Sequence, residues 1–166
     1  MEMNKNMKNK KEKIIKIVNI ALVIIWMVII FWFSAQVGDD SSNISGNTLR
    51  KIITFINQNI SQQELERLVE LFQPVIRKLA HYTMYTVGGF LIYNQQRTLK
   101  DNKNKTVNST IIGILYAITD EIHQLFVPGR SGRILDIGID SLGVITGIFI
   151  YKLLEKLVNY VKTRRK

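Results

Sequence analysis

Long apolar stretches separated by polar links make up most of the chain. Residues 17–33, IVNIALVIIWMVIIFWF, carry no charge, and the apolar run extends back to Ile14. A helix rises about 1.5 Å per residue and the bilayer core is about 30 Å thick, so about 20 residues cross it. Three further apolar stretches contain Gly, Thr or charged residues. The pattern predicts an all-α integral membrane bundle, a single domain of residues 1–166, with about four transmembrane helices at about 14–33, 75–95, 107–127 and 134–154.

These stretches have two other interpretations. A soluble protein would use the last three as core helices, but they are long, aromatic-rich and separated by short basic links. The first follows the basic stretch KNMKNKKEKIIK, as in a cleaved signal peptide. It is longer than the usual apolar core of about 7–15 residues, and the bulky Phe33 stands where a cleavage site needs a small residue. We therefore expect an uncleaved anchor.

The segment 34–74, between the first two predicted spans, has amphipathic spacing. Apolar residues recur there at helical intervals in two groups, and SQQE at 61–64 has the spacing of a capping box. Pro74 either ends the second helix or starts the next one. We expect two short amphipathic helices on the outer membrane face or, with equal weight, the packing helices of a small extracellular cap. The two groups are Leu49, Ile52, Ile53, Ile56, Ile60 and Leu65, Leu68, Val69, Phe72.

The distribution of basic residues indicates a topology. Residues 1–16 contain six Lys, the link 94–106 has four basic residues and one acidic, and residues 152–166 have six basic and one acidic. The segment 34–74 has three basic and five acidic residues. Because Lys and Arg stay on the cytoplasmic side, both termini are predicted to be cytoplasmic and 34–74 to lie outside.

The net charge of +10 then reflects topology and attraction to anionic lipid. Nucleic-acid binding is the alternative, but no other feature supports it, and we expect no nucleic-acid partner. The absence of Cys excludes disulfides and thiolate metal sites.

Ionisable side chains are predicted to gather in the outer half of the bundle. The second span enters from outside, the third runs outward, and the turn VPGRSGR leads into the fourth, so their polar residues fall in one layer. Ionisable side chains inside a membrane are functional candidates by default. The alternative is that these residues form structural salt bridges, in which Arg133 would be one of the cations. The predicted outward-facing pocket is lined by Arg77, Lys78, His81, Tyr85, Asp120, Glu121, His123, Gln124, Arg130, Asp136 and Asp140.

Small residues continue the polar faces toward the inner half. Gly143 and Gly147 follow Asp136 and Asp140 on one stripe, and GVITG is a GxxxG motif. Such residues let helices approach closely in lipid. They predict a tight bundle that opens into the polar pocket.

The polar stretches resemble the VanZ-like family of bacterial membrane proteins. The resemblance rests on RKLAHYTMYTVGGFL (77–91), YAITDEIHQLFVPGRSGRILDIGIDSLGVITG (116–147) and, to a lesser degree, FWFSAQVGDDSSNISG (31–46). Met84 stands where many relatives have Glu, and Leu135 stands where a polar or basic residue is common. The resemblance implies a multi-pass protein of the bacterial cytoplasmic membrane. For founding members it also implies low-level resistance to the lipid-tailed glycopeptide teicoplanin, with little effect on vancomycin. It supplies no catalytic residue.

A non-enzymatic binding role is the favoured function. The pocket would bind a membrane lipid, a lipid-linked cell-wall component or a lipoglycopeptide antibiotic, with basic side chains donating to its phosphate or carboxylate. The alternative is a membrane hydrolase or transferase acting on a lipid-linked phosphate, with His81, Asp120 and His123 as candidate catalytic residues. It lacks the known lipid-phosphatase and HExxH signatures. A channel would need oligomerisation, because four helices offer no continuous polar path.

No cofactor and no metal are expected. His81, His123, Asp120 and Asp136 have the chemistry to hold zinc or manganese, since imidazole and carboxylate suit these ions. A histidine beside a carboxylate inside a bundle is more often a hydrogen-bonded structural pair.

Overall fold

The computed structural model describes residues 2–99, 103–130 and 132–164. Within these ranges the chain forms five helices and no strand. The helices are α1 (Glu2–Ser34), α2 (Gly38–Ile56), α3 (Gln62–Arg97), α4 (Lys105–Gln124) and α5 (Ile134–Arg164). The all-α prediction is therefore confirmed. The predicted ranges 14–33, 75–95 and 134–154 lie within α1, α3 and α5, whereas 107–127 extends three residues beyond the end of α4.

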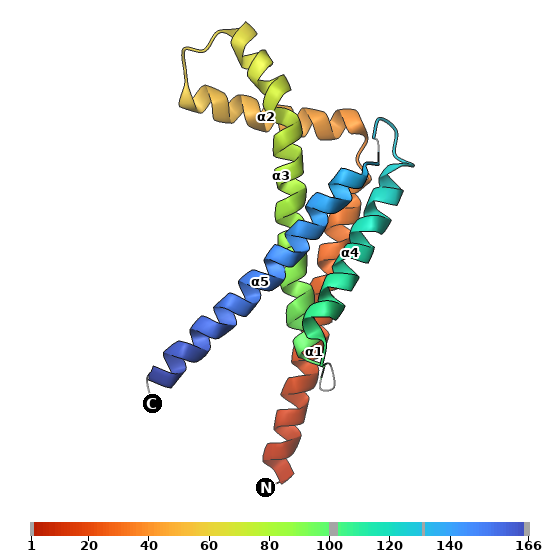
Figure 1. Ribbon diagram of the computed structural model, residues 1–166, viewed down its shortest axis with the longest axis vertical. Coiled ribbons are helices and arrows are strands. Elements are labelled where there is room, and N and C mark those ends of the chain that lie inside the picture. Colours follow the sequence, from red (N-terminus) through yellow and green to blue (C-terminus); the bar gives the residue numbers. More distant parts are fainter. Residues whose placement is uncertain (1, 100–102, 131, 165–166) are drawn as a thin grey trace.

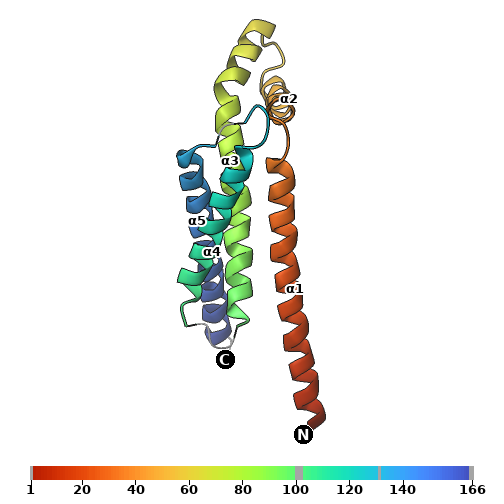
Figure 2. The ribbon, with the colours of Figure 1, turned by 90° about the vertical axis from the view of Figure 1, so that its right-hand side faces the viewer.

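Four long helices form the body of the molecule, and α2 lies across one end of it (Figure 1). Helix α5 crosses α3 obliquely, and α3 contacts each of the other four helices. The loop between α4 and α5 lies at the same end as α2, whereas both chain ends lie at the opposite end (Figures 1 and 2). The polar residues near that loop are thus gathered where α2, α3, α4 and α5 meet.

Glycines bring α3 and α5 into backbone contact. A Cβ at Gly147 would overlap the carbonyl oxygen of Thr86, and one at Gly89 would overlap that of Val144. At Gly143 it would lie 2.6 Å from a backbone oxygen of α3. The predicted close packing at the GxxxG motif is therefore present, with α3 as the partner helix.

Helix α1 docks on this pair through aromatic side chains. Trp26 is buried against Gly88, and its indole N–H donates to the carbonyl of Met84 at 2.8 Å. The hydroxyl of Tyr116 in α4 donates to the carbonyl of Met27 at 2.6 Å. These bonds give α1 a defined register against α3 and α4.

The outer segment differs from the prediction in one respect. Helix α2 is the first amphipathic helix, but the second is not separate, because it forms the first turns of α3, which continues through Pro74. Packing on both sides of the proline holds the helix together: Leu65 and Val69 contact Leu49 of α2, and α5 packs against the later turns. Such packing offsets the cost of an interior proline, which is about 3 kcal/mol.

Side-chain bonds join α2 to the start of α3. The predicted cap is confirmed at Ser61, whose Oγ accepts from the backbone N–H of Glu64 at 3.3 Å. The amide of Gln73 donates to the carbonyl of Ser42 at 2.7 Å. Helix α2 is thereby held over the end of the bundle.

Two helical stretches in the described ranges are long and apolar enough to cross a membrane, Asn9–Ser34 and Ile134–Arg164. Only 17% and 28% of their most apolar windows are buried, whereas the core helix of a soluble protein would be mostly buried. Large apolar side chains such as Val28 and Phe149 face outward. These two helices indicate a membrane protein. Neither α3 nor α4 contains a comparably long and apolar stretch among the described residues.

Candidate functional site

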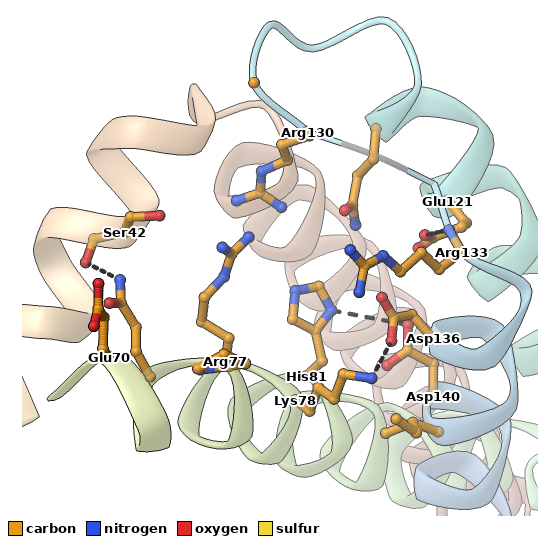
Figure 3. Close-up of a pocket in the computed structure, with 15 residues that line it drawn as sticks. Ser42, Glu70, Arg77, Lys78, His81, Glu121, Arg130, Arg133, Asp136 and Asp140 are labelled. Atoms are coloured by element: carbon orange, nitrogen blue, oxygen red, sulfur yellow. Dashed lines mark hydrogen bonds and ion pairs between the residues drawn. The ribbon is translucent and has the colours of Figure 1, made fainter. Parts of the chain in front are cut away.

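A polar cavity of about 470 Å³ opens at the end of the bundle that α2 covers (Figure 3). Its walls come from α2, α3, the end of α4, the following loop and the start of α5. The charged side chains are of both signs and converge from opposite walls. The cavity is lined by Ser42, Glu70, Gln73, Pro74, Arg77, Lys78, His81, Glu121, Gln124, Gly129, Arg130, Arg133, Asp136, Ile139 and Asp140.

Two arginines enter the cavity from different elements. Arg77 comes from α3 and Arg130 from the loop after α4, and their side chains extend toward each other (Figure 3). Arg130 is anchored, because its Nε donates to the carbonyl of Gln36 at 3.0 Å and its Nη2 to that of Phe33 at 3.1 Å. It therefore ties the loop to the carboxyl end of α1, where free carbonyls and the helix dipole favour a cation.

The third nitrogen of Arg130 is available to a ligand. Its Nη1 is buried without a hydrogen-bond partner in the described part of the chain. Burial, together with the like charge of Arg77, lowers the pKa of Arg130. An anion between the two guanidinium groups would satisfy this N–H and relieve their repulsion.

The opposite wall carries two carboxylates from α5. Asp136 forms an ion pair with Lys78, with 3.1 Å between Nζ and Oδ1. Asp140 lies one turn further on, is 1% exposed, and has its Oδ2 3.8 Å from Nδ1 of His81. Asp136 and Asp140 share one face of α5, and this face lies against Lys78 and His81 of α3.

Asp120 lies behind these residues, inside the bundle. It is 3% exposed, and its Oδ2 accepts from the hydroxyl of Tyr85 at 3.2 Å and from the amide of Gln124 at 3.3 Å. Its Oδ1 has no partner among the described residues. Glu121, the next residue, accepts from the backbone N–H of Arg133 and so holds the start of α5 against the end of α4.

His123 does not join the cavity. Its ring packs against Phe31 of α1, with the ring centroids 4.3 Å apart. One position along the helix from Gln124, it faces α1 instead of α3 and α5. Tyr85 and Asp120 also lie outside the polar cavity, and Asp120 is reached only through its neighbours.

A second, mainly apolar cavity of about 360 Å³ adjoins the first. It lies between the end of α1, α2 and α3. Arg77, His81 and Arg130 line both cavities, so a polar space and an apolar space meet at these three side chains. The second cavity is lined by Ile30, Phe33, Ser34, Gln36, Ile44, Ser45, Thr48, Ile76, Arg77, Ala80, His81, Met84, Tyr85 and Arg130.

No local sequence pattern predicted this second cavity or the contribution of α2 to the polar one. Ser42, Glu70 and Gln73 line the polar cavity because α2 folds back over α3. Only their nearness to the predicted outer layer could have indicated them. Met84 faces the apolar cavity, so methionine suits its surroundings here.

Three donor groups stand close enough together to be considered as metal ligands. They are His81, Asp120 and Asp140, each offering one atom within 4.8 Å of the others. His123 and Asp136, which the sequence offered as partners, are not in this group.

Comparisons with known proteins agree with the motifs in these helices. The model of the VanZ/LLP1 family matches residues 19–155, which include every residue named above as lining either cavity. Curated proteins and solved structures give no significant match. The family match covers most of the chain and all the helices that build the site. The chain belongs to the VanZ/LLP1 family.

Proposed function

We propose that this protein binds an anionic amphiphile of the bacterial cell envelope in the paired cavities. The observation that carries the proposal is the junction of a polar and an apolar cavity at Arg77, His81 and Arg130. A phosphate or carboxylate headgroup would lie between the two guanidinium groups, and an acyl or isoprenoid chain would occupy the apolar space. Arginine suits this role because its planar group donates two parallel hydrogen bonds to such anions.

The proposal includes a membrane topology of four spans. Helix α4 has 20 residues, close to the length that crosses a bilayer, and α3 has 36. At about 1.5 Å per residue α3 is about 54 Å long, so its first turns would project beyond the outer surface and carry α2 with them. Both chain ends lie away from α2, in accord with cytoplasmic termini and an outward-facing cavity (Figure 1).

Anion selectivity tests the binding role directly. The full chain in a neutral detergent would be studied by native mass spectrometry with phosphatidylglycerol, and with zwitterionic phosphatidylcholine of the same acyl chains. We expect preferential binding of phosphatidylglycerol. Arg77→Ala should weaken it about 10- to 100-fold, because a hydrogen bond to a charged group is worth about 1.5–3 kcal/mol.

Arg67→Ala is the matched control, since Arg67 lies on α3 outside both cavities. It should bind phosphatidylglycerol as the unaltered chain does. Equal binding by the Arg77→Ala protein would contradict the proposal, as would equal affinity for the two lipids.

The resemblance to founding family members extends the proposal to teicoplanin. A lipid-tailed glycopeptide is concentrated at the membrane surface, so a protein that binds amphiphiles there would affect it more than untailed vancomycin. The chain would be expressed in a susceptible Gram-positive host beside a His81→Ala, Asp120→Asn variant of equal abundance. Selective protection against teicoplanin, lost in the variant, is the expected result. No protection by the unaltered chain would remove this extension and leave the lipid-binding test standing.

One observation favours the second candidate, an enzyme acting on a lipid-linked phosphate. His81 and Asp140 form an imidazole–carboxylate pair beside two arginines, the elements of a general base and an electrophilic clamp. Release of phosphate from a lipid-linked pyrophosphate by the purified protein, abolished by His81→Ala, would establish it. Absence of turnover with retained lipid binding supports the non-enzymatic role.

A further inference from the structure

An imidazole and two carboxylates from three different helices meet inside the bundle. They belong to His81 of α3, Asp120 of α4 and Asp140 of α5, and their donor atoms lie within 4.8 Å of one another. We infer that these three side chains bind one divalent transition-metal ion, Zn²⁺ or Mn²⁺. The donors are all supplied by the protein, so the site does not rest on the amphiphile proposed above.

Unpartnered oxygen atoms point to a ligand at this place. Both carboxylate oxygens of Asp140 and the Oδ1 of Asp120 are buried and lack a hydrogen-bond donor among the described residues. Asp140 is 1% exposed and Asp120 3%. Buried polar atoms are nearly always satisfied, and a buried unpaired carboxylate is costly. A cation within reach of these oxygens would remove that cost.

No described Lys or Arg side chain forms an ion pair with either of these two carboxylates. Lys78 forms its ion pair with Asp136, and two of the nitrogens of Arg130 donate to α1 carbonyls. The one ion pair that the described residues give either carboxylate is the 3.8 Å approach of His81 to Asp140. Two buried carboxyl groups therefore face one imidazole, and a divalent cation would coordinate all three.

The donor chemistry selects the class of metal. Imidazole nitrogen suits zinc and other transition ions, whereas carboxylate oxygen also suits manganese, so a set of one nitrogen and two oxygens fits Zn²⁺ or Mn²⁺. Ligand atoms about 2.0–2.2 Å from a metal lie roughly 3–4 Å apart, so modest rotations of the three side chains would close the site. Three protein ligands leave at least one coordination position open, and two of them, His81 and Asp140, line the polar cavity.

Neighbouring groups already hold one ligand in place. Tyr85 and Gln124 both donate to Oδ2 of Asp120, which leaves Oδ1 free to coordinate. Hydrogen bonds of this kind orient metal-bound carboxylates and contribute about 10- to 100-fold to affinity. His81 and Asp140 line the same polar cavity as Arg77 and Arg130, so an anion bound there would lie near both the metal and the two guanidinium groups.

The test uses the full chain purified in a neutral detergent through a tag without histidine, stripped with a chelator and passed over a desalting column. Calorimetric titration with ZnCl₂, and electron paramagnetic resonance with MnCl₂, would measure binding of the metal alone. We expect one equivalent per chain. Asp140→Asn and Asp120→Asn should each abolish that equivalent, and Tyr85→Phe should weaken it about 10- to 100-fold.

Two controls match the ligands in chemistry. His123→Gln removes the other histidine of the chain, and Asp136→Asn removes a carboxylate of the same cavity that is paired with Lys78. Both should keep one equivalent. Loss of binding in either would overturn the assignment of the three ligands, as would binding retained by both Asp120→Asn and Asp140→Asn.

A measurement on the unaltered chain keeps the inference testable if a variant fails to fold. X-ray absorption of the zinc-loaded protein should show one imidazole, with oxygen atoms as the remaining ligands. A shell with two imidazoles, or with oxygen alone, would overturn the assignment. Failure of folded, unaltered protein to take up one equivalent would do so too. The lipid experiment with Arg77→Ala is unaffected by either result, so the two proposals fail separately.

Discussion

Two glycines of α5 should respond in opposite ways to the same substitution. Gly147 faces α3, and a methyl group there would overlap the backbone carbonyl of Thr86 and approach the backbone nitrogen of Phe90 at 2.7 Å. At Gly138, apart from its chain neighbours and the nearby backbone of its own helix, no described atom lies within 4 Å of the same position. Substitution by alanine thus adds one methyl group to a closed backbone contact in one variant and to open space in the other.

The change in unfolding free energy depends on which atoms must move to make room for the methyl group. Backbone atoms of a packed helix cannot rotate away, so at Gly147 the two helices must separate. A gap of about 0.5–1 Å forfeits roughly a quarter to a half of each dispersion contact across the crossing. Overpacking costs about 1–3 kcal/mol, and we expect the upper end for Gly147→Ala. Gly138→Ala should instead stabilise by about 0.5–1 kcal/mol, the usual advantage of alanine over glycine within a helix.

The assay is reversible unfolding of the full chain in mixed micelles with increasing sodium dodecyl sulfate, followed by far-ultraviolet circular dichroism. We expect the two variants to differ by about 3–4 kcal/mol in unfolding free energy. A difference below about 0.5 kcal/mol would refute the argument, since that is the ordinary scatter of neutral surface substitutions. It would mean that α3 and α5 are not in backbone contact at this crossing.

Three further outcomes follow from single contacts. Trp26→Phe removes the bond to the Met84 carbonyl and part of a buried ring, so unfolding of the detergent-solubilised chain should need about 2–4 kcal/mol less. Gln73→Leu removes two of the hydrogen bonds that hold α2 over the cavity, and hydrogen exchange of α2 should accelerate with little change in the bundle. The hydrogen bond from Arg50 lowers the pKa of Glu66 below its usual value of 4.5, so the stability this pair contributes is present at neutral pH and lost as the pH falls through that lowered pKa. Carbon-13 titration should show the shift, and Arg50→Ala should abolish it.

The apolar stretches predicted the long helices of the bundle because each stretch is longer than a core helix of a soluble protein needs. The sequence also predicted which faces meet: on the stripe of Asp136, Asp140, Gly143 and Gly147, the last three residues are buried. His123 was included in the pocket because it adjoins Gln124 in the sequence. Adjacent helical positions differ by about 100° in direction, so it belongs to the face that packs against α1.

The continuity of α3 could not be predicted from local signals. Pro74 disfavours a helix interior, and the choice between a break and a continuous helix depends on what packs on either side. Those contacts come from α2 and α5, which lie far from Pro74 along the chain. The apolar cavity escaped prediction for the same reason, because its walls join the end of α1 to α2 and α3 and no single segment carries its pattern.

Arg130 joins the loop, the end of α1 and both cavities, so its removal would mix structural and binding effects. Arg77 has no hydrogen bond or ion pair among the described residues and lines both cavities as well, which makes it the cleaner reporter. A ligand that binds only the folded chain stabilises it by about 2.7 kcal/mol at 100 times its Kd. Phosphatidylglycerol should therefore raise the unfolding temperature of the unaltered protein more than that of the Arg77→Ala variant, whose weaker binding reduces the stabilisation to about 0.4–1.4 kcal/mol at the same lipid concentration. The same ligand raising both equally would place its binding outside the two cavities.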